Sequence, residues 1–534
     1  MKSLERIMEE SHWADKVATE LVKTNPNKRK FILASGITPS GKVHIGNFRD
    51  IITSDFVYRA LKEKGYDAQM IFSWDDYDRL RKIPSNVPQS FSKYLGMPIS
   101  EIPDPYGCHE SYARHFETEL EEVISSLGVD LRFIRQSQMY KANKYYPGIK
   151  RALQNRKEIA KILGEFRTQG ISDEELENYS PLQIYCRKCN KSTETKMTDY
   201  DGEDLVTYSC KCGHTETVDI SKENIGKLSW KIDWPMRWGF EGVDFEPGGS
   251  DHSSPGGSFE TAEKIAREVF NIKPPYFQGY AFVGIRGASK MSSSNGTGFT
   301  PKDLLRIYEP ELLRWVFSRA RPNKALTFFF DSDLIRQYEE FDRKISDYYE
   351  DKLTPTEKRE IELSAISPGK IPKKSNVSFR QVASFGQVVQ GNFEELKRMY
   401  ERIGENYDEE TLKRRLEKSY NWINEFMPEL KIKLRKTPNR EYYESLNDEE
   451  KENIQRLSRE IENHWDLNKL TWLVYDIPKK PEFSDKEKKI AQRNFFKNIY
   501  HMLIDQDTGP RLPTFLIALG KEKSKQLLEV KKDQ

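Results

Sequence analysis

RKFILASGITPSGKVHIGNFRDIITSDFVYRALKEKG, residues 29–65, is the stretch that decides the fold. Its apolar opening predicts a buried strand that ends at Gly36, and a glycine-bearing turn then leads into an amphipathic helix. A second apolar run, YDAQMIF, continues into the acidic loop SWDDYDRLRK. This order places carboxylates at the carboxyl end of a strand, where open α/β sheets bind their ligands. We therefore expect an α/β first domain built on a parallel sheet.

Composition limits the class of protein. The 534 residues exceed what one hydrophobic core serves, since cores stop growing near roughly 250–300 residues. A charged fraction of 32%, a mean hydropathy of -0.77 and no apolar run near the ~18 residues of a membrane span predict a water-soluble protein without membrane contact. The N-terminus lacks a secretory signal, so we expect a cytoplasmic location. With 86 basic and 84 acidic residues, any nucleic-acid binding must depend on local patches.

The turn between the first strand and its helix favours an anion. Backbone N–H groups at a helix start and the helix dipole attract phosphate, and two glycines let the backbone approach closely. His44 precedes the helix, so its imidazole can donate a hydrogen bond to a phosphate oxygen. The alternative is a histidine that only caps the helix. The candidate nucleotide-binding residues of this turn are Thr38, Ser40, Gly41, His44, Gly46 and Asn47.

A second anion-seeking loop, GASKMSSSNG, occupies residues 287–296. Lys290 can neutralise pyrophosphate charge, while serine hydroxyls and loop amides contact the remaining oxygens. A solvated linker is the alternative. Because the strand pattern returns in FVGI at 282–285, immediately before the loop, a shared phosphate site is the better interpretation. The candidate residues are Lys290, Met291, Ser292, Ser293 and Ser294.

HIGN followed by KMSSS resembles the paired HIGH and KMSKS elements of class I aminoacyl-tRNA synthetases. HWADKVA, ASGITPSGKVHIGN, DDYDRLRKIP, WKIDWPMRW, GGSDH and RPNKA are similar to segments of the class I lysyl-tRNA synthetase family, over roughly the first two thirds of the chain. The resemblance implies that His44, Gly46 and Asn47 contact ATP, and that Lys290, Ser292 and Ser293 hold pyrophosphate. It further implies Mg²⁺-ATP, L-lysine and tRNA as substrates, with in-line attack of the amino-acid carboxylate on the α-phosphate.

The same resemblance places Asp251 and His252 in the adenosine or amino-acid pocket. Glutamate-specific relatives carry an arginine ahead of the P-x-G turn, where this chain has Ala34-Ser35-Gly36, so a substrate carboxylate finds no partner. A cationic substrate favours acidic and aromatic walls. The alternative is that the acidic loop only caps a helix or pairs with Arg79 and Arg81. The substrate-binding candidates are Gly36, Asp75, Asp76, Asp78, Trp230, Asp251, His252 and Tyr280.

Two departures from the family pattern concern specificity. Ala281 follows Tyr280 where we expect an acidic residue, and Asn295 follows KMSSS in place of a second basic residue. These departures leave open a paralogue of altered or lost activity. Two further interpretations compete with a lysine-specific synthetase: a nucleotidyltransferase on the same fold and a non-catalytic RNA-binding protein. The transferase interpretation leaves some two hundred helical residues unexplained.

Four of the five cysteines lie between residues 186 and 212. Their two close pairs are typical of a tetrahedral structural zinc site, formed by Cys186, Cys189 and Cys210 with either Cys212 or His214; we favour Cys212. For a second group the family resemblance suggests zinc too, and its composition permits zinc, although an ordinary helix cap and surface residues explain it as well. This second group consists of Asp104, Cys108, His109 and His115.

The predicted fold is α/β: a Rossmann-like nucleotide-binding parallel sheet with a zinc-bearing insertion, followed by a largely α-helical C-terminal region. The basic segments 431–440 and 488–501 are candidate tRNA contacts, the second with interleaved aromatic residues, although solvated helix faces have the same composition. The expected domains are the first half of the sheet at 1–139, a connective insertion with a zinc ribbon at 140–245, the second half with the KMSSS loop at 246–340, and a helical anticodon-binding region at 341–534.

Overall fold

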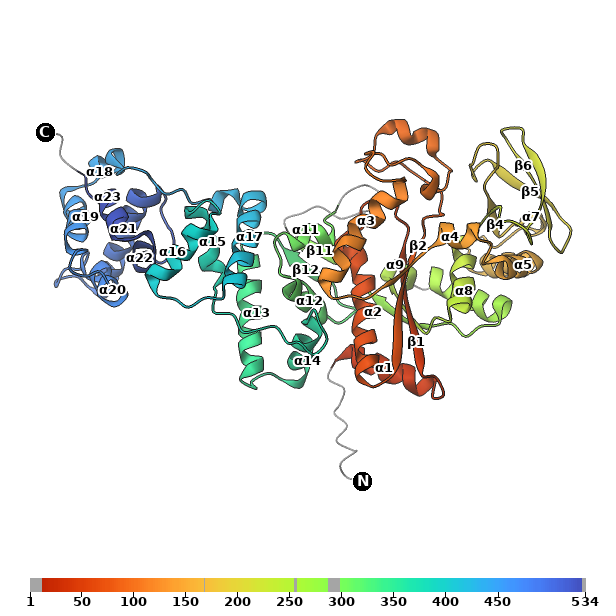
Figure 1. Cartoon of the computed structure of the whole chain (residues 1–534), viewed down its shortest axis with the longest axis horizontal. Helices are drawn as coiled ribbons and strands as arrows, with labels where there is room; N and C mark the ends of the chain where they lie inside the picture. Colours follow the sequence, from red (N-terminus) through yellow and green to blue (C-terminus); the bar gives the residue numbers. More distant parts are fainter. Residues whose placement is uncertain (1–11, 168, 254–256, 287–297, 531–534) are drawn as a thin grey trace, which may run out of the picture. The chain divides into compact units, whose positions relative to one another are not determined.

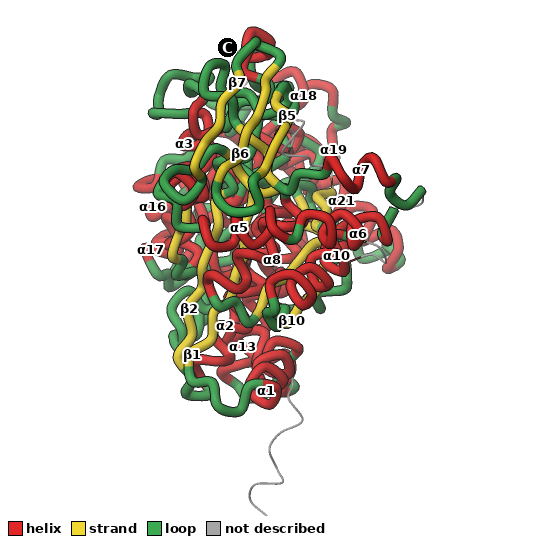
Figure 2. The backbone as a smooth tube through the Cα atoms, turned by 90° about the vertical axis from the view of Figure 1, so that its right-hand side faces the viewer, coloured by secondary structure: helices red, strands yellow, loops and turns green. Residues whose placement is uncertain are grey.

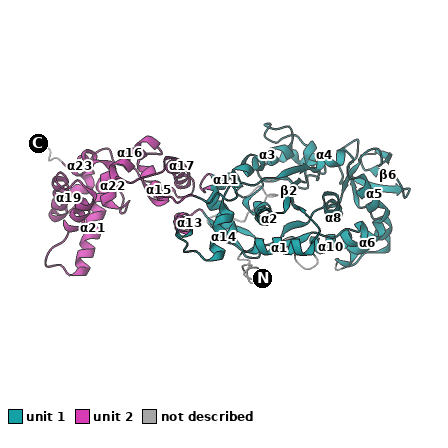
Figure 3. Cartoon of the chain, turned by 60° about the horizontal axis from the view of Figure 1, so that its bottom comes forward, with its two compact units in different colours: residues 1–305, 310–329, 347–372 teal, residues 306–309, 330–346, 373–534 magenta. Residues whose placement is uncertain are grey.

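The computed structural model describes residues 12–167, 169–253, 257–286 and 298–530. The chain forms two compact units, coloured separately in Figure 3. The first unit comprises residues 1–305, 310–329 and 347–372, and the second comprises 306–309, 330–346 and 373–534. Every strand with described residues belongs to the first unit.

The first unit is built on a five-stranded sheet in the order β10-β9-β1-β2-β3, in which all neighbours are parallel. This order confirms the α/β fold class and its parallel sheet. The chain moves outward from β1 through β2 to β3, and then returns to the other side of β1 as β9 and β10. Figure 1 shows β1 and β2 side by side. The strands are β1 (Lys30–Ile37), β2 (Asp67–Trp74), β3 (Arg132–Arg135), β9 (Phe245–Gly249) and β10 (Tyr276–Tyr280).

Helix α2 (Ile45–Glu63) connects β1 to β2 and contacts both strands as well as β9. The two strands pair in parallel from Lys30 with Asp67 to Ile37 with Trp74, and three consecutive central residues of each are buried. Such runs form because helices cover both faces of a parallel sheet, so side chains on either face leave water. A Cβ atom at Gly36 would meet the Ser73 carbonyl oxygen at 3.0 Å, so the close approach of the strands favours glycine there.

The insertion between β3 and β9 forms two small antiparallel sheets. One pairs β4 (Leu182–Ile184) with β8 (Gly226–Leu228), and the other has the order β5-β6-β7. Figure 2 shows β5, β6 and β7 side by side. Their bounds are β5 (Thr195–Tyr200), β6 (Leu205–Cys210) and β7 (Thr215–Asp219).

The strand predicted at 282–285 exists, but it lies outside the main sheet. It is β11 (Val283–Arg286), which pairs in parallel with β12 (Leu326–Phe329) in a separate two-stranded sheet. The main sheet resumes earlier, at β9 and β10. The sequence of β9, FEPGG, contains proline and two glycines, which oppose strand formation in a typical strand, so its pattern is weak.

Helices form most of the remaining regular secondary structure in the described residues. The predicted helical tail is confirmed, since the described residues from 341 to 530 contain no strand. Residues 365–378 contain neither helix nor strand and connect α14 (Pro355–Ser364) to α15 (Phe379–Val388). In the parts of the chain that the structure describes, no helix combines the length and apolarity of a membrane span. The helices used below are α1 (Trp13–Thr24), α3 (Tyr112–Ile124), α5 (Tyr146–Gln154), α8 (Trp230–Glu241), α9 (Ser250–Ser253), α18 (Arg440–Ser445), α20 (Leu467–Asp476) and α21 (Asp485–Ile504).

Candidate active site and metal centres

The candidate site lies at the carboxyl ends of the central strands. The direction of strand order reverses between β1 and β9, and this switch point is where open α/β sheets bind ligands. The turn 38–44 leaves the end of β1 and leads into the N-terminus of α2. The Tyr112 hydroxyl of α3 donates to the Ser40 carbonyl oxygen at 2.8 Å, which ties this turn to the neighbouring helix.

His44 is the N-cap residue of α2. Its Nδ1 accepts a hydrogen bond from the Asn47 backbone N–H at 3.3 Å, and the Asn47 Oδ1 accepts one from the His44 backbone N–H at 3.2 Å. Burial lowers the pKa of His44, so the imidazole is neutral near pH 7. Because Nδ1 accepts, the ring proton resides on Nε2. The cap and the phosphate donor proposed from the sequence are therefore compatible in one residue.

Residues 287–297, with Lys290, Met291, Ser292, Ser293 and Ser294, lie outside the described residues. Both flanks of this segment contact the first two turns of α2. After it, the Phe299 carbonyl oxygen accepts from the Ile45 backbone N–H at 2.8 Å. Before it, Arg49 donates to the carbonyl oxygens of Ala281 at 2.6 Å and Phe282 at 3.3 Å. Described residues on both sides of the segment therefore contact the helix that His44 caps.

The acidic loop after β2 does lie at the predicted carboxyl end, and its three carboxylates have internal partners. Asp76 accepts from the backbone N–H of Ser137 at 2.7 Å and from its hydroxyl. Burial raises the pKa of Asp76 to about 7, although these hydrogen bonds oppose the shift. Asp75 lies 2.8 Å from the guanidinium of Arg237. Asp78 accepts from Thr38 Oγ1 at 2.9 Å.

A buried lysine of the insertion completes this acidic cluster. Lys227 on β8 is 2% exposed, and its Nζ lies 2.6 Å from Asp78, 3.4 Å from Asp233 and 3.9 Å from Asp75. The ion pairs of the acidic loop are thus made with Lys227 and Arg237. Of the anticipated partners, Arg81 contributes a smaller effect, since its charge helps to lower the pKa of Asp78. Sequence reasoning missed Lys227 and Arg237 because they follow the loop by about 150 residues.

Aromatic side chains gather near β9 and β10, on the side of the switch point away from β2. Trp230 at the start of α8 lies 6.4 Å, between ring centroids, from His252 of α9 and stacks on Trp234 at 4.8 Å. Tyr280 ends β10, and its hydroxyl hydrogen bonds to the carboxyl of Asp50. The side chain of Asp251 lies outside the described part of the structure. The structure thus associates Trp230 with His252, and Tyr280 with an acid not singled out from the sequence.

Two half-buried acids, Asp50 on α2 and Glu246 on β9, form the second acidic group near the switch point. Trp238 Nε1 donates to Glu246 at 2.6 Å. Burial raises the pKa of Glu246 to about 7, and burial together with the charge of Glu246 raises that of Asp50 well above its ordinary value. A sequence signal existed for Asp50, which is an acidic residue just after HIGN in a helix that is otherwise mostly buried.

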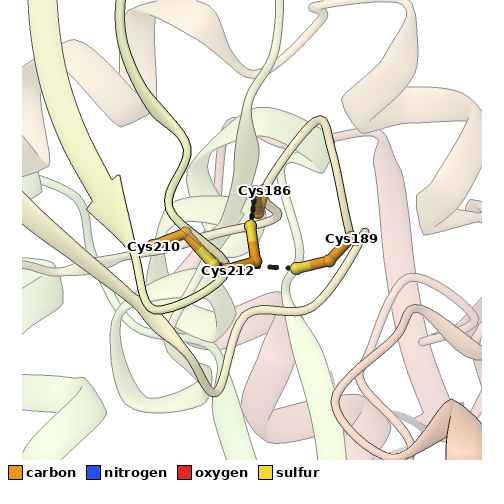
Figure 4. A group of neighbouring side chains, drawn as sticks. All are labelled: Cys186, Cys189, Cys210 and Cys212. Carbon is orange, nitrogen blue, oxygen red and sulfur yellow. Dashed lines mark hydrogen bonds between the residues drawn. The ribbon is translucent and has the colours of Figure 1, made fainter.

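The four clustered cysteines converge from two turns of the insertion (Figure 4). Cys186 and Cys189 follow β4, while Cys210 ends β6 and Cys212 precedes β7. The sulfur atoms of Cys186 and Cys212 lie 3.6 Å apart, as do those of Cys189 and Cys210. Tetrahedral zinc with Zn–S bonds near 2.3 Å requires sulfur separations of about 3.8 Å, so these thiols fit a metal ion. Of the two candidates for the fourth ligand, Cys212 belongs to the cluster. The Nε2 of His214 instead lies 3.3 Å from Glu216.

The second predicted group also converges, with all four ligand atoms within 4.8 Å of one another. Cys108 Sγ lies 3.1 Å from His109 Nδ1 and 3.3 Å from His115 Nδ1, and Asp104 lies 3.3 Å from His115. Asp104 also accepts backbone hydrogen bonds from Tyr106, Cys108 and His109. These bonds lower the pKa of Asp104 to about 2, although burial opposes the shift. An ionised carboxylate, two imidazoles and a thiol suit zinc or another borderline cation.

The basic segments proposed for tRNA fall in the second unit. Residues 431–440 lead into α18, and residues 488–501 lie within α21. The aromatic residues interleaved in α21 mostly face the core, since Phe495 and Tyr500 are buried. Lys489 and Arg493 of the same helix are exposed. Trp472 on α20 is 58% exposed and is a better candidate for a base-stacking surface than the aromatic residues of α21.

Comparison with known proteins gives consistent matches. The profile of the family "tRNA synthetases class I (K)" matches residues 11–367. A lysine--tRNA ligase of Pyrococcus furiosus is 36% identical, covering 96% of this chain and 98% of its own length. Lysine--tRNA ligases of Streptomyces coelicolor and Borreliella burgdorferi are 35% and 37% identical, each over 97% of this chain and over 97% and 99% of their own lengths. These matches cover more than the two thirds in which the sequence motifs occur, and the chain belongs to the class I (K) family of tRNA synthetases.

Proposed function

We propose that this chain activates L-lysine with ATP and transfers the lysyl group to a lysine-accepting tRNA. The near-full-length similarity to lysine--tRNA ligases carries this proposal. The family assignment already makes the chain an aminoacyl-tRNA ligase, so the departures at Ala281 and Asn295 bear on substrate preference and rate. The active-site geometry supports the proposal through the position of His44 at the switch point of the sheet.

Asp50 and Glu246 are the proposed partners of the substrate ammonium group. Asp75 and Asp78 already pair with Arg237 and Lys227. The pKa values of Asp50 and Glu246 are raised instead, and for Glu246 burial outweighs the opposing charge of Arg237. An ammonium group between Asp50 and Glu246 offsets the repulsion of two carboxylates and their burial. Tyr280, Trp230 and His252 would form aromatic and polar walls around the aliphatic stem. The other candidates, Asp76 and Asp251, are proposed to support the pocket.

The activation step needs positioning and charge neutralisation but no protein nucleophile. In the proposed step an oxygen of the lysine carboxylate attacks the α-phosphorus of ATP, the bond to the bridging oxygen breaks, and pyrophosphate leaves. The Nε2–H of His44 donates to a phosphate oxygen, and the backbone from Thr38 to Asn47 surrounds the phosphates. Lys290, with the serines that follow it, is proposed to neutralise the leaving pyrophosphate. Mg²⁺ would arrive with ATP and supply further neutralisation.

Zinc is the proposed ion for both metal groups. In the insertion, four cysteine thiolates would hold it, and its contribution there is to stabilise the fold. In the second group Asp104, Cys108, His109 and His115 are the proposed ligands, and they lie at the start of α3. Both sites complete their ligand sets from protein side chains, which is typical of structural zinc.

Residues 341–534, most of which belong to the second unit, are the proposed anticodon-binding region. The other proposed domains are the first half of the sheet at 1–139, the insertion at 140–245 and the second half of the sheet at 246–340. Exposed cations on α21 and exposed Trp472 on α20 support the anticodon-binding role through charge and stacking, the two contributions that bind single-stranded RNA. A cytosolic setting is proposed, because clustered thiols remain available to metals in a reducing compartment.

Pyrophosphate exchange across all twenty amino acids tests the proposal. We expect exchange that depends on L-lysine, followed by lysylation of unfractionated tRNA. Exchange that needs no amino acid would favour a nucleotidyltransferase, and exchange with a different amino acid would indicate a paralogue of altered specificity. An inactive protein that still binds tRNA would contradict the catalytic proposal.

A further inference from the structure

The ammonium group of Lys227 lies within the acidic cluster at the carboxyl end of β2. The lysine side chain is 2% exposed, and its ammonium group lies within 4 Å of three carboxylates, those of Asp75, Asp78 and Asp233. Arg237 shares two of these, Asp75 at 2.8 Å and Asp233 at 3.2 Å. Two cations and three carboxylates therefore form one connected buried network.

Asp78 connects this network to the phosphate-binding turn. Its Oδ1 faces Lys227 Nζ at 2.6 Å, and its Oδ2 accepts from Thr38 Oγ1 at 2.9 Å. Because the two contacts use different oxygens, they fix both the position and the rotation of the carboxylate. Thr38 is the first residue after β1, where the turn toward His44 begins. A displacement of Asp78 would therefore be passed to the start of that turn.

The pairing is strong because Lys227 is buried and Asp78 is only 19% exposed, so water screens their charges little. Burial alone would raise the pKa of Asp78, but the charge and hydrogen bond of Lys227, together with the hydrogen bond of Thr38, hold it below its ordinary value. Removing one partner of a buried charge pair leaves the other uncompensated, which is more damaging than the loss of an exposed ion pair. An unpaired Asp78 would become protonated or turn toward water, and in either case its contact with Thr38 would change.

We propose that Lys227 is a positioning residue for ATP, which acts through Asp78 and Thr38 on the turn 38–47 and does not touch the substrates. This inference rests on the proposed function, since it assigns ATP to that turn. It also gives the insertion a role in the active site. Lys227 lies on β8, which pairs with the strand that precedes Cys186, and Tyr185 donates to the Tyr77 carbonyl oxygen at 2.6 Å.

A double-mutant cycle tests the path through Asp78. We expect Lys227→Met and Thr38→Val each to raise KM for ATP by roughly 10- to 100-fold, as loss of a hydrogen bond to a charged group does, while KM for lysine changes by less than about threefold. If both act through Asp78, the double variant should be no more than about threefold worse than the more impaired single variant. Additive effects, or an equal rise in both KM values, would overturn the inference.

Lys150→Met is the matched control. Lys150 on α5 also pairs with two carboxylates of the insertion, Glu203 at 2.9 Å and Asp204 at 3.2 Å, but has no contact with the acidic loop. We expect it to leave both KM values unchanged, so a general effect of removing a lysine from the insertion would be recognised.

Asp78→Asn is the second variant to test if Lys227→Met does not yield folded protein. The amide keeps an oxygen for Thr38 but loses the charge that holds Lys227, so KM for ATP should rise and an unchanged value would refute the proposal. Lysine-dependent exchange by the unmodified protein is measured first. Its absence refutes the proposed function, whereas its presence with an ATP-neutral Lys227→Met refutes only the role of Lys227.

Discussion

Glu246→Gln is the most direct perturbation of the proposed lysine pocket. The change keeps the size of the side chain and removes its charge, and Trp238 Nε1 retains an oxygen to which it donates at 2.6 Å in the unmodified protein. Truncating one partner of a buried hydrogen-bonded charge pair costs about 2–5 kcal/mol. A loss near 3 kcal/mol corresponds to a rise of roughly 150-fold in KM for lysine. Because ATP does not use this carboxylate in our proposal, KM for ATP should change little.

The pH dependence of KM for lysine tests the same pocket independently, because the pKa of Glu246 determines the direction of the change. Burial raises the pKa of Glu246 to about 7, so the carboxyl is increasingly protonated below that pH and loses its attraction for an ammonium ion. Lysine, whose side chain has a pKa near 10.4, keeps its charge throughout this range. KM for lysine should therefore fall as pH rises through about 6–8, and approach a tenfold change per pH unit on the acidic side. In Glu246→Gln this slope should decrease.

Steady-state pyrophosphate exchange at varied lysine and fixed saturating ATP measures both effects. Glu241→Gln is the matched control, since Glu241 ends α8, the helix that carries Trp238, and pairs with Arg132 at 2.8 Å away from the pocket. The reasoning fails if Glu246→Gln stays within about twofold of the unmodified protein in KM for lysine while Glu241→Gln does the same. It also fails if KM for lysine rises with pH.

Other substitutions separate the remaining parts of the proposal. Lys290→Ala should slow lysine-dependent exchange by roughly 10²–10³ at saturating substrates, and unchanged exchange would exclude Lys290 from catalysis. Cys189→Ser should release about one zinc ion per chain, as measured by elemental analysis, and lower Tm; retained zinc would disprove the four-cysteine site. Lys489→Glu combined with Arg493→Glu should raise KM for tRNA by ~10-fold with exchange unaffected. If the variant and the unmodified protein have the same KM for tRNA, these two residues do not belong to the RNA-binding surface.

The sequence predicted those parts of the molecule in which nearby residues determine the structure. The β1–turn–α2 unit was predictable because its apolar strand, glycines and helix start are contiguous. The cysteine cluster was predictable for the same reason, since two short pairs within one insertion fix the ligand spacing. The short strands β3 and β9 carry too few residues for a period to be recognised, and pairing of β3 with β2 and of β9 with β10 stabilises them.

Contacts between distant residues were the part that could not be predicted. Asp78 is a correct choice for the carboxyl end of β2, yet its partner Lys227 lies 149 residues away, and only the folded insertion brings them together. The sequence alone offers Arg79 and Arg81 as nearer cations. The aromatic residues of α21 illustrate the same difficulty, because a basic helix with interleaved rings has the same composition whether the rings face RNA or the core, and Phe495 faces the core.

Helix α2 explains how one element can serve both halves of the proposed activation step. His44 caps it beside the phosphate-binding turn, Arg49 holds the chain that leads to residue 287, and Asp50 lies beside Tyr280 and Glu246. With a rise of 1.5 Å per residue, the six steps from His44 to Asp50 span about 9 Å along a single rigid helix. A carboxylate attacks an α-phosphate only when both are held in near-contact, so a fixed spacing between the phosphate and ammonium sites contributes directly to the rate. In the proposed step, the first two turns of α2 would therefore set the distance between the two substrates, and the adjoining loops would contribute the charges.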